Sequence, residues 1–152
     1  MLNPVINRQD IEAARERIGS VVRPTPVVAI DALADVAGRP VLVKPEYGQR
    51  TGSFKIRGAY NFISRLPPGT EVVAASAGNH AQGVALAASL VGLRSTIYMP
   101  ANAALPKVEA TRKYGATIRL EGGVVDECLA GARAYAESTG AVYVPPFDDA
   151  LV

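Results

Sequence analysis

Glu71-Val-Val-Ala-Ala-Ser-Ala-Gly-Asn-His80 is the stretch that decides the fold of this 152-residue chain. It begins as a short apolar run, passes through a turn of small residues at 76–78, and enters an Ala-rich segment that continues to Val91. A short apolar run that ends at small polar residues before a longer apolar segment indicates a buried strand followed by a helix. The stretch therefore predicts one strand–helix unit of a parallel sheet.

The same alternation continues through the second half of the chain. We expect strands at 71–75, 95–99, 116–120 and 141–144, and helices at 79–91, 104–114 and 124–138. Gly92, Gly115 and Gly140 each follow one of these helices, where a left-handed C-terminal residue favours glycine. Near-continuously apolar strands that alternate with helices predict an α/β fold, in which a parallel sheet is flanked by helices on both faces.

The N-terminal part is less regular. Asn7 is a candidate N-cap for a first helix, and Pro24 and Pro26 favour an extended backbone after it. We expect a helix at 8–18, a strand at 41–44, a loop at 47–53 and a helix at 54–66.

Composition excludes several classes of function. The chain is 49% hydrophobic and 20% charged with a net charge of +2, which is typical of a globular domain. No basic run exceeds two residues, so nucleic acid is not an expected partner. No signal peptide and no apolar stretch long enough for a membrane span is evident, which predicts a cytoplasmic protein without a membrane partner. Cys128 and His80 are the single cysteine and histidine, so no disulfide and no zinc site is expected.

Lys55 is the candidate catalytic residue. It follows the bulky apolar Phe54 and stands at the start of the expected helix at 54–66. Exclusion of water and the positive end of the helix dipole both favour the neutral, nucleophilic form of an amine, as a Schiff-base enzyme requires. A solvated helix position is the more usual role of a lysine, and it remains the alternative.

Residues 76–80 are the candidate anion-binding segment. They lie at the carboxyl end of a predicted parallel strand, where open α/β sheets bind ligands, and free backbone N–H groups at a helix start attract anions. The same residues also suit an ordinary helix start capped by Ser76 or Asn79. In isolation His80 is expected to be a helix residue with satisfied hydrogen bonds. Glu46 and Arg57 form either an ion pair that fixes the lysine loop or a catalytic pair.

Two segments carry a resemblance to a known family. They are Lys-Pro-Glu-Tyr-Gly-Gln-Arg-Thr-Gly-Ser-Phe-Lys-Ile-Arg-Gly-Ala at 44–59 and Ser-Ala-Gly-Asn-His-Ala-Gln-Gly-Val-Ala at 76–85. Together with Met99-Pro100, Pro106-Lys107 and the segments 10–26 and 145–148, they resemble the serine/threonine dehydratases. These belong to the fold-type-II pyridoxal-phosphate enzymes and include the threonine ammonia-lyases. The resemblance spans nearly the whole chain.

The resemblance implies a fold of the tryptophan synthase β type and a division of the chain. Residues 1–59 would be the N-terminal part of the large domain, 60–144 the small α/β domain, and 145–152 a connector to a remainder of the enzyme beyond Val152. The implied cofactor is pyridoxal 5'-phosphate, linked covalently to Lys55. The other implied site residues are Phe54 and Asn79 for the cofactor and Ser76, Ala77, Gly78 and His80 for the substrate carboxylate.

The implied reaction is β-elimination from L-threonine, or from L-serine, which gives a 2-oxo acid (2-oxobutanoate from threonine) and ammonia. The family's glycine-rich phosphate loop would lie beyond Val152, so we expect the 152-residue chain to be inactive alone and the longer enzyme to be a homo-oligomer. One alternative is a serine racemase-like enzyme, which needs a second acid or base where this chain has Ala77. The other is a non-catalytic, truncated module.

Overall fold

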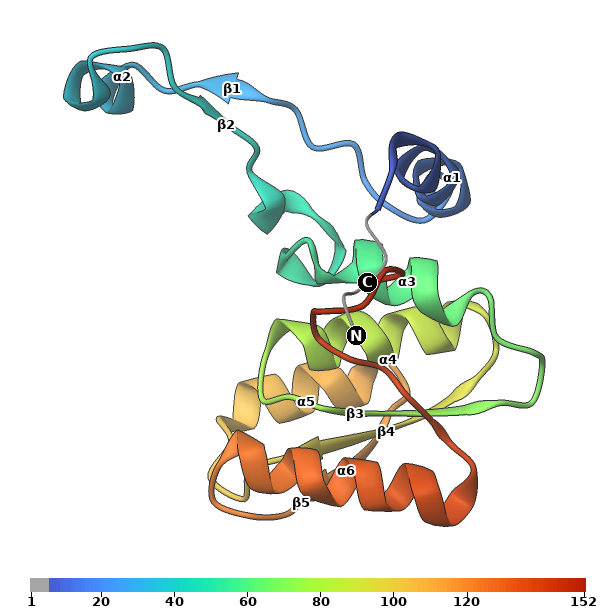
Figure 1. The fold of residues 1–152 in the computed structure, drawn as a ribbon. Coiled ribbons are helices and arrows are strands. Elements are labelled where there is room, and N and C mark those ends of the chain that lie inside the picture. Colours follow the sequence, from blue (N-terminus) through green and yellow to red (C-terminus); the bar gives the residue numbers. More distant parts are fainter. Residues whose placement is uncertain (1–5) are drawn as a thin grey trace.

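A four-stranded parallel sheet forms the centre of the computed structural model, which describes residues 6–152 (Figure 1). Its strands are β3 (Glu71–Ala75), β4 (Arg94–Met99), β5 (Thr117–Leu120) and β6 (Val142–Tyr143), in the spatial order β5-β4-β3-β6. Val72 of β3 pairs with Ser95 of β4 on one side and with Val142 of β6 on the other. The chain thus moves outward from β3 to β5 and then returns to the opposite side of β3.

Helices cover both faces of this sheet. They are α3 (Lys55–Ile63), α4 (Asn79–Leu90), α5 (Leu105–Lys113) and α6 (Val125–Thr139). In Figure 1, α6 lies below the sheet, α4 and α5 lie above it, and α3 lies on the outer side of α4. The prediction of a parallel α/β sheet between helices is confirmed, and every boundary from β3 to β6 lies within one residue of the expected position.

The core explains why the strands are almost continuously apolar. Val72 and Ala74 pack in a cluster with residues of α3 and α4, whereas Val73 and Ala75 pack with Cys128 and other residues of α6. All four of these strand residues are buried, because alternate side chains of β3 point to opposite, helix-covered faces.

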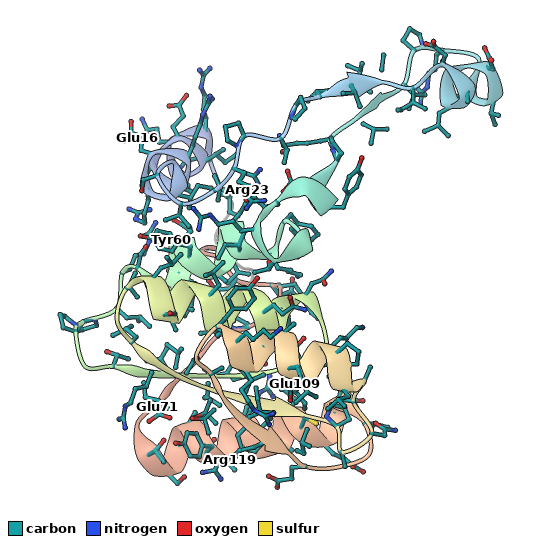
Figure 2. All side chains as sticks on the ribbon, turned by 180° about the vertical axis from the view of Figure 1, so that it is seen from behind. Glu16, Arg23, Tyr60, Glu71, Glu109 and Arg119 are labelled. Carbon is teal, nitrogen blue, oxygen red and sulfur yellow. The ribbon has the colours of Figure 1, made fainter. Side chains whose placement is uncertain are left out.

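A polar cluster fixes α6 at the amino end of the sheet. Glu71 Oε1 accepts hydrogen bonds from Thr96 Oγ1 and Tyr135 OH, both at 2.8 Å. The Arg119 guanidinium lies over the Tyr135 ring, with its carbon 4.7 Å from the ring centroid. Figure 2 shows Glu71 and Arg119 at this end of the molecule. The cluster joins β3, β4, β5 and α6 across the sheet.

The N-terminal region is an extended arm. It contains α1 (Arg8–Ile18), β1 (Val28–Ala29), α2 (Asp31–Ala37), β2 (Leu42–Val43) and the 3₁₀ turns η1 (Glu46–Gly48) and η2 (Arg50–Gly52). The predicted cap of α1 is confirmed, since Asn7 Oδ1 accepts from the backbone of Gln9 and Asp10. β1 and β2 pair antiparallel and project away from the sheet (Figure 1).

The structure differs from the expectations for this region and for the helix that follows it. β1 and α2 were not expected, because β1 pairs over two residues and α2 buries none of its side chains. The strand expected at 41–44 is limited to 42–43, and the helix expected at 54–66 ends at Ile63. The expected loop at 47–53 contains the two 3₁₀ turns.

Within residues 6–152, no helix combines the length and hydropathy needed to cross a bilayer.

Candidate active site

The topology of the sheet locates the candidate site. β3 and β6 are neighbours, but the chain leaves them into different parts of the molecule, through the turn at 76–78 and through the segment at 144–148. Such a switch in strand order creates a crevice at the carboxyl ends of the strands, where open α/β sheets bind ligands. The predicted anion-binding segment therefore lies at the expected edge of the sheet.

Helix α4 begins there without a side-chain cap. Gly78 is the N-cap residue, and within the described residues no side chain accepts a hydrogen bond from the first turn of α4. Ser76 Oγ accepts instead from the Gly78 N–H at 3.1 Å, inside the turn. The interpretation of 76–80 as an ordinary Ser- or Asn-capped helix start is therefore wrong. Backbone N–H groups at an uncapped helix start favour an anion.

Lys55 is the first residue of α3, and its amine lies beside a cavity. Its Nζ donates to the Pro146 carbonyl at 2.6 Å and lies 5.1 Å from the centroid of the Phe54 ring. The cavity has a volume of about 460 Å³. Its lining residues are Phe54, Lys55, Arg57, Gly58, Pro146, Phe147, Asp148 and Val152. A primary amine is thus held at a cavity that Phe54 and the segment after β6 enclose.

Gly83 brings the lysine to helix α4. A Cβ atom at Gly83 would lie 3.1 Å from the carbonyl carbon of Lys55 and 3.2 Å from its oxygen, closer than an ordinary contact. The absence of a side chain at Gly83 lets the first residue of α3 lie this close to α4, and a larger residue would push the two helices apart. Sequence reasoning did not identify Gly83, because a glycine inside an apolar helix does not reveal which element packs on it.

His80 connects the first turn of α4 to the exit of β6. The side chain is buried, and Nε2 lies 3.0 Å from the Val144 carbonyl, to which the Nε2–H tautomer donates. Burial lowers the pKa of His80 to about 4; the charge of Lys55 acts in the same direction and the Val144 carbonyl opposes it. His80 is therefore neutral near pH 7. Its Nδ1 is buried and has no partner among residues 6–152, so the expectation of a fully satisfied helix histidine is wrong.

Glu46 and Arg57 form the ion pair that fixes the lysine loop. Arg57 donates from Nε to Glu46 Oε2 at 2.8 Å and from Nη2 to Oε1 at 2.9 Å, a bidentate contact. The hydrogen bond from Arg57 lowers the pKa of Glu46 to about 2, with help from the Thr25 hydroxyl and against the effect of burial. Because Arg57 lies in the first turn of α3, this pair holds the turn that carries Lys55.

Gln49 adds a second anchor that sequence reasoning missed. Its amide donates to the Arg23 carbonyl and accepts from the Arg23 N–H, both at 2.8 Å, as a neighbouring strand would. The side chain is buried. Two residues later Thr51 adopts a left-handed backbone (φ 63°), which is unusual for a β-branched residue. The two hydrogen bonds between Gln49 and Arg23 therefore hold the loop before Lys55 against the extended segment after α1.

The remaining predicted site residues lie around these elements. Phe54 is 56% exposed at the cavity, and Asn79 is exposed at the first position of α4. Ser76 and Ala77 are half-buried in the turn after β3. His80 lies close enough to Lys55 for the lysine charge to act on it. The roles of these residues toward a cofactor or substrate stay predictions.

The Glu46–Arg57 pair predicts a specific pH dependence. A carboxylate whose pKa is lowered from 4.5 to about 2 stabilises the fold fully above pH 4.5 and loses that contribution as the pH falls toward 2. Glu46→Gln should lower the free energy of unfolding by about 2 kcal/mol at pH 7 and flatten its pH dependence between these values. Denaturant titrations across this pH range measure both effects.

Glu109→Gln is the matched control for this prediction. Glu109 pairs with Arg112 on the surface of α5, where both side chains are about half exposed. Its loss should change the free energy of unfolding by less than about 0.5 kcal/mol. A Glu46→Gln chain with the wild-type pH profile would contradict the assigned role of the pair.

Comparisons with known proteins give the family. The family model described as "Pyridoxal-phosphate dependent enzyme" matches residues 18–152. The chain is 47% identical over 148 residues to an L-threonine ammonia-lyase of Thermotoga maritima. This alignment covers 95% of the chain and 37% of the relative. It is 46% identical over 145 residues to an L-threonine ammonia-lyase of Geobacter sulfurreducens, and that alignment covers 93% of the chain and 36% of the relative. The chain thus spans little more than a third of the length of these relatives.

Solved structures agree with this assignment. A maize serine racemase superposes with a TM-score of 0.86 at 36% identity, over 93% of this chain and 44% of that one. A threonine deaminase of Solanum lycopersicum superposes with a TM-score of 0.84, also at 36% identity, over 95% of this chain and 42% of that one. The family model covers most of the sequence, and the relatives match nearly all of it. The chain belongs to the family of pyridoxal-phosphate dependent enzymes.

Proposed function

We propose that this chain carries the catalytic lysine and the substrate-carboxylate loop of a pyridoxal-phosphate dependent ammonia-lyase that acts on L-threonine or L-serine. The observation that carries the proposal is the position of Lys55. Its amine lies beside a cavity, and its backbone packs on α4, whose first turn offers uncapped N–H groups. The relatives named above are threonine ammonia-lyases. The domain division, the cytoplasmic location and the homo-oligomeric state stay predictions.

The residues present fit the cofactor. Lys55 offers a primary amine for a covalent link to its aldehyde, and Phe54 offers an apolar wall beside that amine. Asn79 is exposed at the start of α4, where its amide would bond the ring oxygen of the cofactor. Within residues 6–152 the buried Nδ1 of His80 has no hydrogen-bond partner, so the site has a polar atom that could bind a ligand.

The proposed division of labour follows from these positions. When bound, the cofactor supplies a conjugated ring that accepts the electron pair of the substrate α-carbon. The N–H groups of residues 76–80 would bind and orient the substrate carboxylate. Lys55 Nζ would take the α-proton, since an amine that anchors the ring also lies next to the reacting carbon. Phe54 and the segment 146–148 would exclude water from the cavity.

Ala77 favours elimination over racemisation. A racemase needs a second acid or base on the other face of the reacting carbon. The half-buried Ala77 in the turn after β3 carries a methyl group with no exchangeable proton. This residue supports the lyase over the serine racemase-like alternative, although a serine racemase is among the similar structures.

Removal of the lysine tests the proposal most simply. Lys55→Ala in the protein that carries this sequence should lower 2-oxo acid release from threonine by at least about 1,000-fold, because both the anchoring amine and the proton acceptor are lost. Lys113→Ala, an exposed lysine on α5, is the control and should retain activity. Turnover by the Lys55→Ala protein near the wild-type rate would refute the proposal.

Gly78 tests the carboxylate loop. An added Cβ at Gly78 would meet nothing within 4 Å, but the backbone there (φ −146°, ψ −138°) lies outside the regions that residues other than glycine prefer, so the fold of Gly78→Val is checked first by far-ultraviolet circular dichroism. The larger side chain should block the approach of a carboxylate and raise KM for threonine by roughly 10-fold or more, the value of a hydrogen bond to a charged group. Steady-state kinetics measure this change.

Gly123→Val provides the comparison, because Gly123 lies in a different loop and a Cβ there would also fit without a clash. It should leave KM unchanged. If Gly78→Val had the KM of the wild type, the substrate carboxylate would have to bind elsewhere.

A further inference from the structure

Phe147 is an exposed aromatic residue at the candidate site, and the proposed function gives its ring no contact with the cofactor. Its side chain is 69% exposed, yet the residue lines the same cavity as Lys55. Phe54, which lines this cavity too, is 56% exposed. Two large apolar rings are thus open to solvent at one cavity, beside a primary amine. Exposed aromatic surface at a cavity is open to a planar ligand, and binding of such a ligand would bury it.

The segment that carries Phe147 is held on both sides of the ring. Before it, the Val144 carbonyl accepts from His80 Nε2 at 3.0 Å and the Pro146 carbonyl accepts from Lys55 Nζ at 2.6 Å. After it, the Leu151 carbonyl accepts from Asn61 Nδ2 at 2.8 Å. Figure 1 shows this C-terminal segment, in red, crossing α4 and reaching α3. Residues 147–148, the tip of this segment, therefore lie between backbone carbonyls that accept hydrogen bonds from side chains of α4 and α3.

The backbone is conformationally restricted on both sides of Phe147. Two consecutive prolines precede Phe147, and each restricts φ. Asp148, which follows it, has a left-handed backbone with φ of 59°, a conformation that aspartate tolerates better than most residues. Left-handed residues other than glycine persist where the surrounding structure requires them, often at ligand clamps. The residues on both sides of Phe147 thus limit the conformations that this segment can adopt.

We propose that Phe147 is a further cofactor-contacting residue: its ring packs with Phe54 against the planar ring of pyridoxal phosphate once the cofactor is linked to Lys55. This inference rests on the proposed function. An amine committed to the cofactor would no longer hold the Pro146 carbonyl as it does in this structure, so the residues next to Phe147 would lose one anchor. Phe147 and Phe54 could then hold the cofactor between them, because burial of two aromatic rings against a conjugated ring is favourable.

Reductive trapping tests this inference. The chain is incubated with increasing pyridoxal phosphate, borohydride fixes a stable pyridoxyl label, and peptide mass spectrometry reads the extent of labelling at Lys55. Phe147→Ala should raise the cofactor concentration for half-maximal labelling by roughly 2- to 10-fold, the worth of one aromatic contact. It should also weaken the circular dichroism that the chain induces in the absorption band of the cofactor.

Two variants make the result specific. Phe147→Tyr keeps the ring and should label as the wild type does. Leu105→Ala removes an equally exposed apolar side chain (69%) from α5, outside the cavity, and should have no effect. Because Phe147 is exposed, its replacement should leave the far-ultraviolet circular dichroism of the chain unchanged.

The possible outcomes separate this inference from the proposed function. Labelling at Lys55 that is the same in Phe147→Ala and in the wild type, with unchanged induced dichroism, overturns the role of Phe147 alone. Labelling of the wild type at Lys44, Lys107 or Lys113 in place of Lys55 overturns the proposed function and this inference with it.

Discussion

The close contact between the start of α3 and helix α4 is the constraint on which the candidate site depends. Gly83 carries no side chain, so the Lys55 backbone lies where a Cβ would come within 3.1 Å. The contact continues along both helices through buried apolar residues, among them Ile56 and Ile63 on α3 and Val84 on α4. Because α4 begins directly after β3, this packing places the lysine at the carboxyl edge of the sheet.

Electrostatics at the site are arranged around the lysine. Glu46 neutralises Arg57, which lies in the first turn of α3 and lines the same cavity as Lys55. Burial keeps His80 neutral near pH 7, since its pKa is lowered to about 4. Neither residue therefore adds an uncompensated positive charge beside Lys55. The uncapped N–H groups of α4 supply the fixed positive potential that an anionic substrate group requires.

The regular half of the fold could be predicted from the sequence because its signals are local. Apolar runs defined the strands from β3 to β6, and the glycines after α4, α5 and α6 are left-handed as expected, with φ of 71°, 90° and 78°. The candidate lysine and the candidate anion-binding segment at 76–80 were proposed from the same local patterns, which left open whether the start of α4 is capped. Helix α2 was missed because it buries no side chain and so has no apolar periodicity tied to a core.

The contacts that complete the site could not be predicted, and the reason is physical. Lys55, His80 and Asn61 donate to the carbonyls of Pro146, Val144 and Leu151. Backbone carbonyls are the same in every residue, so their partners leave no trace in the sequence. The role of Gly83 depends on which helix packs against it, which only the three-dimensional arrangement shows. The interaction of Gln49 with Arg23 is likewise a contact between a side chain and a distant backbone.

Backbone amide chemical shifts on addition of pyridoxal phosphate test the central claim that one site forms where α3, α4 and the exit of β6 meet. The account predicts that shift changes concentrate at 53–58, 76–80 and 144–148, three segments separated in sequence and joined in the fold. Lys55→Ala should abolish those shift changes that develop slowly, because they depend on the covalent link between the cofactor and Lys55. Changes confined to the opposite end of the sheet, around Glu71 and Arg119, would contradict the account.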